Sequence, residues 1–326
     1  MLKILFYQAK AAKIRRLYFS QSEDIFKMLT EQDIKDCRLE TIRDVIRYAM
    51  TRFEEEGIFL GHGCADCYEE AYFLVLRALK LDFSDLERFW EARLTAKELK
   101  RILEMIERRA VDKVPTPYLL NEAWLTDHVF YCDERVLIPR SYIAELLQDA
   151  FDPWVDDPEE VTSVLDLCTG SGCLGILAAE TFPNAKVDCA DISPDALDVA
   201  EINLANYGLT DEIELVETDL FNNLQGRKYD IIISNPPYVT EEAMDNLTDE
   251  YKHEPELALG AGVDGLDIVR RMLAEAKDHL NDGGLLIVEV GDGREACEEA
   301  FPELPFIWLS TENEEDMVFL LRKEDL

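Results

Sequence analysis

From residue 161 to the end of the sequence, short apolar runs alternate with amphipathic ones, and this alternation restricts the fold more than any other feature. Most of the segments between the apolar runs have the spacing of helices. Alternating strand and helix units predict an α/β fold with a parallel, doubly wound sheet covered by helices on both faces. Two last β-prone runs, FIWLS and DMVFLLR, are joined by a short polar turn, so we expect a final antiparallel hairpin. The five strands predicted before it are VTSVLDL, KVDCA, IELVETD, YDIIISN and GLLIVEV.

The first third of the chain is predicted to be helical. Apolar residues recur every three or four positions in residues 41–57, where Thr41 and Asp44 form a start signal and Gly57 a stop signal. Two more helices are expected at residues 68–81 and 95–109. The second of these begins with a Thr95/Glu98 capping pair and directs Leu99, Ile102, Leu103 and Ile106 inward. Residues 1–35 are expected to add another helix.

The pattern changes at Pro115 and Pro117, because neither proline can continue a helix. The β-prone runs HVFYC and RVLIP follow, and we expect them to form a connecting hairpin that Pro139 and Arg140 close. The sequence therefore predicts three parts: an N-terminal helical domain, a linker with a β-hairpin, and a catalytic α/β domain. Their expected boundaries are 1–112, 113–140 and 141–326.

Acidic residues greatly outnumber basic ones. The chain has 69 Asp and Glu residues against 33 Lys and Arg residues, a formal net charge of −36. Such a surplus argues against stable binding to duplex nucleic acid or to an anionic membrane, because both are negatively charged. It favours a basic macromolecular partner, a saline interior or simply high solubility.

No apolar stretch approaches the ~20 residues that a membrane span needs. The basic first 22 residues lack the long apolar segment of a secretory signal, so we expect a cytoplasmic protein, with a transit peptide as the alternative.

Among eight cysteines only Cys64 and Cys67 form a C-x-x-C pair, and no second pair completes a zinc site. We therefore expect no metal and reduced thiols.

A glycine-rich loop connects the first predicted strand to its helix. It begins at Asp166 and contains Gly170, Gly172 and Gly175, which spell the G-x-G-x-x-G of dinucleotide sites. Glycines at such a position let the backbone approach a ligand closely. The loop fits either a nicotinamide dinucleotide or S-adenosyl-L-methionine, or else a tight turn without a ligand.

Two aspartates follow the next two strands. Asp191 ends the second predicted strand, where an acid is placed to hold ribose hydroxyls. Asp219 closes the third and could accept a hydrogen bond from an adenine amino group, although a solvated strand-end aspartate would look the same. Both positions are compatible with any cofactor that contains adenosine.

The tetrapeptide Asn235-Pro236-Pro237-Tyr238 follows the fourth predicted strand, beside the glycine loop. An amide or aryl amine nitrogen is a poor nucleophile, because its lone pair is delocalised. The Asn235 side-chain oxygen and the Pro236 carbonyl could accept its two N–H groups, while Pro237 restricts Pro236 and Tyr238 offers a flat wall. Hydride transfer has no use for this arrangement, so methyl transfer to a planar nitrogen is favoured.

Together with the glycine loop, this tetrapeptide makes the chain resemble class I S-adenosyl-L-methionine-dependent methyltransferases, which have a seven-stranded Rossmann-like sheet. Adenine-amino and protein-glutamine methyltransferases share the motif. The rest of the chain, over about residues 40–326, closely resembles the ribosomal-protein glutamine methyltransferases, which modify the third protein of the large subunit and belong with the release-factor enzymes. The similar segments are TIRDVIRYAMTRF, GIFLGHG, YLLNEAW, DERVLIPRSYIAELL, DLCTGSGCLGI, GVDGLDIVRRMLAEA and FPELPFIWL.

The resemblance implies a role for each matching residue. The helical domain would recognise a basic ribosomal protein, and a glutamine side chain would become N5-methylglutamine. Asn235, Pro236, Pro237, Tyr238 and Arg140 would bind the substrate, with Asn235, Pro236 and Tyr238 as the catalytic residues. The cofactor would be held by Asp166, Thr169, Gly170, Ser171, Gly172, Asp191, Asp219 and Asn235.

Three further residues have alternative interpretations. Cys168 replaces a common glycine, so we expect its backbone to avoid positive φ. His62 could be a base but is more typical of a structural hydrogen-bonding residue, and Arg140 could clamp a ligand or form a salt bridge. The competing functions are an adenine-amino methyltransferase on nucleic acid, a release-factor glutamine methyltransferase, a nicotinamide-dependent oxidoreductase and a non-catalytic assembly factor. The sequence leaves the oligomeric state open.

Overall fold

The computed structural model describes residues 38–311 and 315–326, which form two compact units. The smaller unit contains residues 38–60 and Cys64–Lys113, and the larger contains Gly61–Gly63 and Val114–Leu326. Of the predicted linker, 113–140, all residues but Lys113 thus belong to the larger unit. The helix expected at residues 1–35 lies outside the described residues.

The smaller unit contains the three helices that the sequence predicts within the described residues, and a short helix, α6 (Leu86–Phe89), that it did not predict. Capping boxes begin two of them, since Thr41 exchanges hydrogen bonds with Asp44 and Thr95 exchanges them with Glu98. Gly57 ends the first helix in the left-handed region, at φ 59°. The helices are α4 (Ile42–Glu56), α5 (Cys67–Ala78), α6 (Leu86–Phe89) and α7 (Ala96–Ala110).

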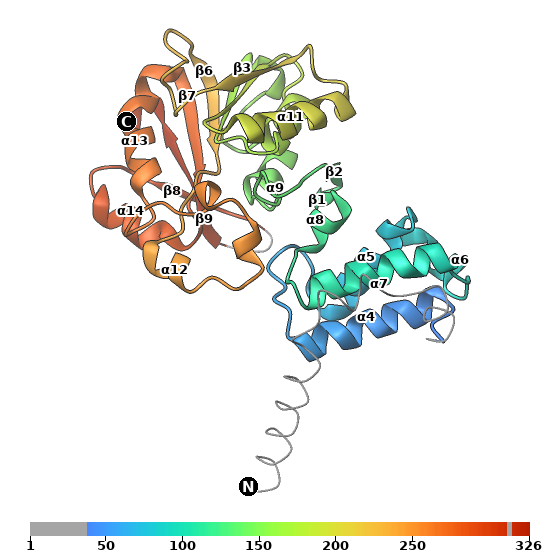
Figure 1. Ribbon diagram of the computed structural model, residues 1–326. Helices are drawn as coiled ribbons and strands as arrows, with labels where there is room; N and C mark the ends of the chain where they lie inside the picture. Colours follow the sequence, from blue (N-terminus) through green and yellow to red (C-terminus); the bar gives the residue numbers. More distant parts are fainter. Residues whose placement is uncertain (1–37, 312–314) are drawn as a thin grey trace, which may run out of the picture. The chain divides into compact units, whose positions relative to one another are not determined.

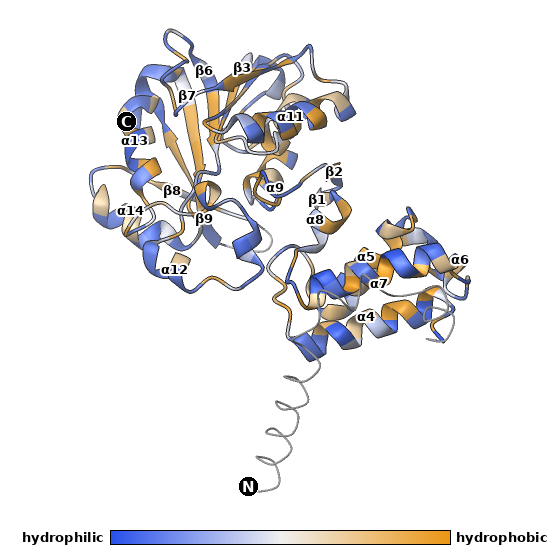
Figure 2. Ribbon diagram, viewed as in Figure 1, coloured by the Kyte–Doolittle hydropathy of each residue, from blue (hydrophilic) through white to orange (hydrophobic). Residues whose placement is uncertain are grey.

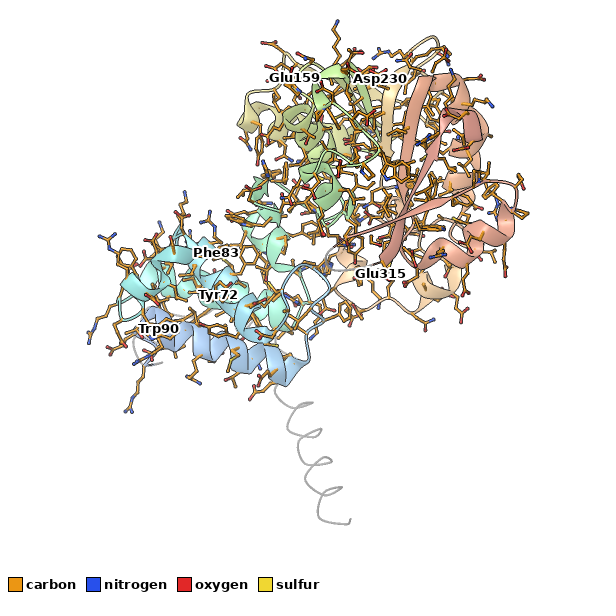
Figure 3. The ribbon with its side chains drawn as sticks, turned by 180° about the vertical axis from the view of Figure 1, so that it is seen from behind. Tyr72, Phe83, Trp90, Glu159, Asp230 and Glu315 are labelled. Carbon is orange, nitrogen blue, oxygen red and sulfur yellow. The ribbon has the colours of Figure 1, made fainter. Side chains whose placement is uncertain are left out.

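Apolar faces of α4, α5 and α7 form the core of this unit, and the four residues expected to point inward from α7 are all buried. The rings of Tyr72 and Phe83 meet edge to face with centroids 5.6 Å apart (Figure 3). Arg109 and Glu70 form a buried ion pair inside the same core. The unit therefore combines ordinary helix packing with one internal charge pair.

A seven-stranded sheet organises the larger unit (Figure 1). Its strand order is β5-β4-β3-β6-β7-β9-β8, and all pairs are parallel except those that β9 makes with β7 and β8. The predicted parallel sheet with a terminal antiparallel hairpin is confirmed. The strands are β3 (Ser163–Leu167), β4 (Lys186–Asp191), β5 (Ile213–Glu217), β6 (Tyr229–Ser234), β7 (Leu280–Glu289), β8 (Ile307–Ser310) and β9 (Glu315–Arg322).

Helices cover both faces of the sheet. The strands of the sheet are the most hydrophobic part of the larger unit (Figure 2). One face packs against α9 (Ile143–Gln148) and α10 (Cys173–Thr181), and the other packs against α13 (Asp267–Ala276) and α14 (Arg294–Ala300). A sheet buried on both faces explains why its strands are almost continuously apolar. The remaining α-helices of the larger unit are α8 (Thr116–Leu120), α11 (Pro194–Tyr207) and α12 (Glu241–Asp245).

The predicted connecting hairpin is placed differently. β1 (Ala123–Leu125) pairs with β2 (His128–Phe130) across a two-residue turn, whereas the run RVLIP forms no strand. The main-chain groups of that run instead form hydrogen bonds with distant side chains. The Tyr118 hydroxyl donates to the Val136 carbonyl, and Ile138 N–H donates to the Glu254 carboxylate. The prediction that HVFYC pairs with RVLIP was therefore wrong.

Polar side chains align the central strands where they begin. Asp230, near the start of β6, accepts hydrogen bonds from the main-chain N–H groups of Thr162 and Ser163 beside β3, and from the Asn281 amide of β7. Figure 3 labels Asp230 and Glu159 at this end of the unit. Because the starts are held in register, the carboxyl ends of the same strands meet at the opposite edge.

No helix among the described residues is long and apolar enough to cross a membrane.

Candidate functional site

A cavity of about 320 Å³ lies where β3, β4 and β6 end. These strands meet at the switch point of the sheet, because the chain builds β4 and β5 on one side of β3 and then returns to place β6 on the other. The volume is in the range of small-molecule sites. Eight of the predicted site residues line it: Arg140, Thr169, Gly170, Ser171, Asp191, Asp219, Asn235 and Pro237.

Four predicted site residues do not line the cavity. Asp166 and Gly172 lie at the two ends of the glycine loop, and Pro236 and Tyr238 follow Asn235 by one and three positions in the chain. These four can act on the site only through their neighbours or their main chain.

The glycine loop is held by the buried carboxylate of Asp166. Its Oδ2 accepts from the Thr169 hydroxyl and from Gly175 N–H at 2.9 Å. Gly175 is also required for packing, because a Cβ there would lie 2.1 Å from Cys189 Sγ. Burial raises the pKa of Asp166 to about 7.

Cys168 has a φ of 63°. The expectation that its side chain excludes positive φ was wrong. The loop reverses direction immediately after β3, and Thr169 N–H donates to the Ala190 carbonyl of β4. This hydrogen bond, together with those of Asp166, holds the loop in the turn despite the unfavourable left-handed conformation.

Asp191, at the end of β4, is fixed by main-chain donors. Its Oδ2 accepts from Gly170 N–H at 2.9 Å, and its Oδ1 accepts from Ser193 N–H at 2.9 Å. Ser193 in turn caps α11. Each carboxylate oxygen has a second lone pair, so a hydroxyl pair in the cavity could still donate to Asp191.

Asp219 lies two residues beyond β5 and pairs with a basic residue that the sequence did not suggest. Arg271 Nη2 lies 2.8 Å from Asp219 Oδ1, and both residues line the cavity. The pair is close to half exposed and therefore marks the solvent side of the site.

Asn235, directly after β6, has an asymmetric environment. Its amide nitrogen Nδ2 lies 3.1 Å from Glu289 Oε1. Its amide oxygen Oδ1 is buried and has no hydrogen-bonding partner among the described residues. A buried amide oxygen without a partner costs free energy, on the order of 1–3 kcal/mol, so its retention at a cavity wall suggests that a ligand supplies the missing donor.

Glu289, the last residue of β7, is the main functional candidate that the sequence prediction missed. It is 1% exposed and accepts from the Ser141 hydroxyl at 2.6 Å and from Tyr142 N–H at 2.9 Å. The Tyr238 hydroxyl lies 3.4 Å from its other oxygen. The sequence signal was available, since Glu289 is a single acid in the apolar run GLLIVEV.

Arg140 forms a salt bridge, one of its two predicted interpretations. Its guanidinium holds the buried carboxylate of Glu254 at two points, and His62 Nε2 lies 3.8 Å from the same carboxylate. Neither His62 ring nitrogen has a hydrogen-bonding partner among the described residues, and the polar contact of the ring is the longer one to Glu254. His62 also packs on the Tyr251 ring, so its contacts are those of a structural residue.

The residues that the structure describes contain no cluster of His, Cys, Asp and Glu able to hold a metal ion. The polar lining of the cavity instead includes glycine main chain, two acids after β4 and β5, one amide after β6 and the arginines Arg135, Arg140 and Arg271. Such a set offers acceptors to a ligand with hydroxyl and amino donors, and basic groups to a ligand that also carries a negative charge.

The sheet order and a cavity of this kind at its switch point define a class I methyltransferase. A family model described as "Methyltransferase small domain" matches residues 144–260. The ribosomal protein uL3 glutamine methyltransferase of Neisseria gonorrhoeae (strain ATCC 700825 / FA 1090) is 50% identical over 288 residues, covering 88% of this chain and 96% of that protein. The chain belongs to the family of ribosomal protein uL3 glutamine methyltransferases.

Other members are similarly close. The relative from Burkholderia pseudomallei (strain K96243) is 50% identical over 293 residues, covering 88% of this chain and 95% of its own length. The relative from Francisella tularensis subsp. tularensis (strain SCHU S4 / Schu 4) is 43% identical, covering 93% of this chain and 96% of its own length. Both carry the same name, and the likeness extends over the helical unit as well as the sheet.

Proposed function

We propose that this protein transfers the methyl group of S-adenosyl-L-methionine to the side-chain amide nitrogen of a glutamine in ribosomal protein uL3, giving N5-methylglutamine. The observation that carries the proposal is the amide of Asn235. Its nitrogen is occupied by Glu289, while its buried oxygen has no partner among the described residues and belongs to a cavity wall.

The cavity residues fit the proposed cofactor, which would supply an electrophilic methyl group on a sulfonium. Asp191 would accept from the ribose hydroxyls, because its carboxylate is already oriented by two main-chain donors. Thr169, Gly170 and Ser171 would contact the methionine portion, with Gly172 shaping the loop. Asp219 would lie at the adenine, on the solvent side of the cavity.

Asn235 and Pro236 would prepare the substrate nitrogen. Asn235 Oδ1 and the Pro236 carbonyl would each accept one N–H of the glutamine amide, which directs the nitrogen lone pair away from these two oxygens. The new N–C bond forms as the S–C bond breaks, releasing S-adenosylhomocysteine, and the nitrogen then loses one proton to water. No base is needed beforehand, because the nitrogen becomes strongly acidic only as the methyl group arrives. Holding the reactants in this geometry accounts for much of the rate in comparable reactions.

The proposed partner is a basic ribosomal protein, and the helical unit would take part in recognising it. The chain's net charge of −36 is complementary to such a substrate and unfavourable for nucleic acid, the alternative substrate of this motif. We also propose that the protein acts in the cytoplasm, where ribosomal proteins are made and assembled.

The deciding experiment is methylation with labelled S-adenosyl-L-methionine of purified uL3, a release factor and a mixture of other ribosomal proteins, each analysed by mass spectrometry. We expect label on one glutamine of uL3. Label on the release factor alone, or on none of the proteins, would overturn the substrate assignment.

A matched pair of variants tests the site. Asn235→Ala should lower the methylation rate at least ~100-fold while cofactor affinity, measured by calorimetry, changes only a few-fold. Asn184→Ala, an exposed asparagine before β4, should behave like the wild type in both assays. Full activity of Asn235→Ala would exclude the proposed role of its oxygen.

A further inference from the structure

We propose that Glu289 is a positioning residue: its carboxylate fixes which end of the Asn235 amide faces the cavity, and so determines whether the site can accept the substrate N–H groups. The inference rests on the proposed function and assigns a role to a residue that does not line the cavity. It follows from four contacts to one buried carboxylate.

Both oxygens of Glu289 accept hydrogen bonds from donors on separate elements. Oε2 accepts from the Ser141 hydroxyl at 2.6 Å and from Tyr142 N–H at 2.9 Å, both in the loop before α9. Oε1 lies 3.1 Å from Asn235 Nδ2 and 3.4 Å from the Tyr238 hydroxyl, both after β6. The adjacent β6 and β7 strands place these groups together.

An ionised carboxylate can only accept hydrogen bonds, so the Asn235 side chain must direct its NH2 group toward Glu289. Its oxygen is then left for the cavity. If the amide rotated by 180°, the NH2 group would meet the N–H groups of the incoming glutamine, and two donors would face each other. The orientation of the Asn235 amide, with its oxygen toward the cavity, is therefore as important as the position of the residue.

The loop before α9 determines which substitution can test this idea. The Tyr142 main-chain N–H cannot become an acceptor, so whatever replaces Oε2 of Glu289 must be an oxygen. In Glu289→Gln the single side-chain oxygen would face Tyr142, and the new NH2 group would face Asn235. Asn235 would then rotate to offer its oxygen to residue 289, and its own NH2 group would face the cavity.

A second substitution should again place a hydrogen-bond acceptor toward the cavity. In Asn235→Asp, one carboxylate oxygen can accept from the NH2 group that Glu289→Gln introduces, and the other oxygen stays available for the substrate. Asn235→Asp combined with Glu289→Gln therefore recreates the arrangement with every donor matched to an acceptor. Asn235→Asp alone places two carboxylates together and should be poorly active.

Protonation of Glu289 would mimic the glutamine variant. Burial is the main cause that raises the pKa of this carboxyl to about 7, so its ionised fraction changes near neutral pH. The titratable group that contacts it is the Tyr238 hydroxyl, after β6, whereas Tyr142 contacts it through its main-chain N–H. Arg140 and Tyr142 act electrostatically on Tyr238. Activity that depends on an ionised Glu289 should rise with pH through this region.

The kinetic test compares wild type, Glu289→Gln, Asn235→Asp and the double variant with uL3 as substrate. We expect Glu289→Gln to lower kcat about 100-fold, with KM and S-adenosyl-L-methionine affinity within about threefold of wild type. The double variant should recover at least about tenfold relative to Glu289→Gln, and its kcat should lose the rise with pH near neutrality. Glu159→Gln, at the opposite end of the sheet, is the matched control and should change none of these values. Unchanged kcat in Glu289→Gln, or a folded double variant no more active than either single variant, would overturn the proposal.

A spectroscopic test needs neither substrate nor variants that alter folding. In the wild type, the side-chain amide signals of selectively ¹⁵N-labelled Asn235 should shift with a midpoint near the pKa of Glu289. Signals that stay constant from about pH 5 to pH 9 would refute the coupling. Should the signals titrate while uL3 is not methylated, the substrate assignment fails but the role of Glu289 stands.

Discussion

Arg140 and Glu254 are joined at two points: Nη1 lies 2.5 Å from Oε1, and Nη2 lies 2.7 Å from Oε2. The Glu254 side chain is fully buried, and it also accepts from Ile138 N–H at 3.0 Å. The pair thus fixes residues 138–140 against residues 251–258, and both segments contribute residues to the cavity wall.

Removing the positive partner should destabilise the larger unit. Arg140→Met leaves the Glu254 carboxylate buried without its ion pair, and we expect the free energy of unfolding to fall by about 3 kcal/mol. Arg140→Met with Glu254→Gln should be less destabilised, because no uncompensated charge remains. Urea denaturation measures both, and Lys252→Ala, which breaks the exposed Lys252–Asp249 pair, should have no measurable effect. A double variant as unstable as Arg140→Met would show that packing rather than charge dominates.

Gly175 and Cys189 should be energetically coupled. A methyl group at position 175 would overlap Cys189 Sγ, so Gly175→Ala should cost about 1–3 kcal/mol of stability. Cys189→Ala removes the sulfur that is in the way, and the double variant should therefore be more stable than the sum of the two single changes predicts. Additive effects in thermal or urea unfolding would mean that the backbone, rather than the sulfur, receives the strain.

Stability should fall as the pH rises toward neutrality. The pKa of Asp166 is about 7 in the folded chain, against an ordinary value of 3.8, so the folded state keeps a proton that the unfolded state has lost. Unfolding between about pH 4 and pH 7 therefore releases a proton and becomes easier with rising pH. Asp166→Asn should remove a slope that amounts to on the order of 3 kcal/mol across this window. Equal pH profiles for wild type and variant in cofactor-free denaturation would contradict the assignment.

The charge of the chain should influence how fast it meets its substrate. Association of an acidic protein with a basic ribosomal protein is accelerated by long-range attraction, which salt screens. We expect the association rate with isolated uL3, measured by stopped-flow fluorescence, to fall about tenfold between roughly 50 mM and 500 mM salt. An association rate that does not change with salt would show that long-range attraction does not steer the substrate. It would leave the proposed chemistry at Asn235 unaffected.

Features encoded by neighbouring residues were predictable from the sequence. The caps at Thr41 and Thr95, the stop at Gly57 and the alternation of strands and helices each depend on a few consecutive residues, and all are present. The strand-end positions of Gly170, Asp191 and Asn235 followed from the same alternation, since parallel strands end at one edge.

Features that depend on distant partners were not predictable. RVLIP has the composition of a strand, but its main chain forms hydrogen bonds with the side chains of Tyr118 and Glu254 instead of with another strand. The positive φ of Cys168 depends on hydrogen bonds of the whole loop. The lone acid in GLLIVEV makes Glu289 noticeable in the sequence, but its contact with Asn235 becomes evident only when β7 is known to lie beside β6.

The position of β9 has a consequence for synthesis. β9 pairs with β7 along Leu285–Glu289, yet it comes after every other strand in the chain. While the ribosome is still translating residues 315–322, the strand that ends in Glu289 lacks one of its two neighbours. The site that is proposed to modify ribosomal proteins thus gains its supporting strand only once its own translation has passed the last hairpin.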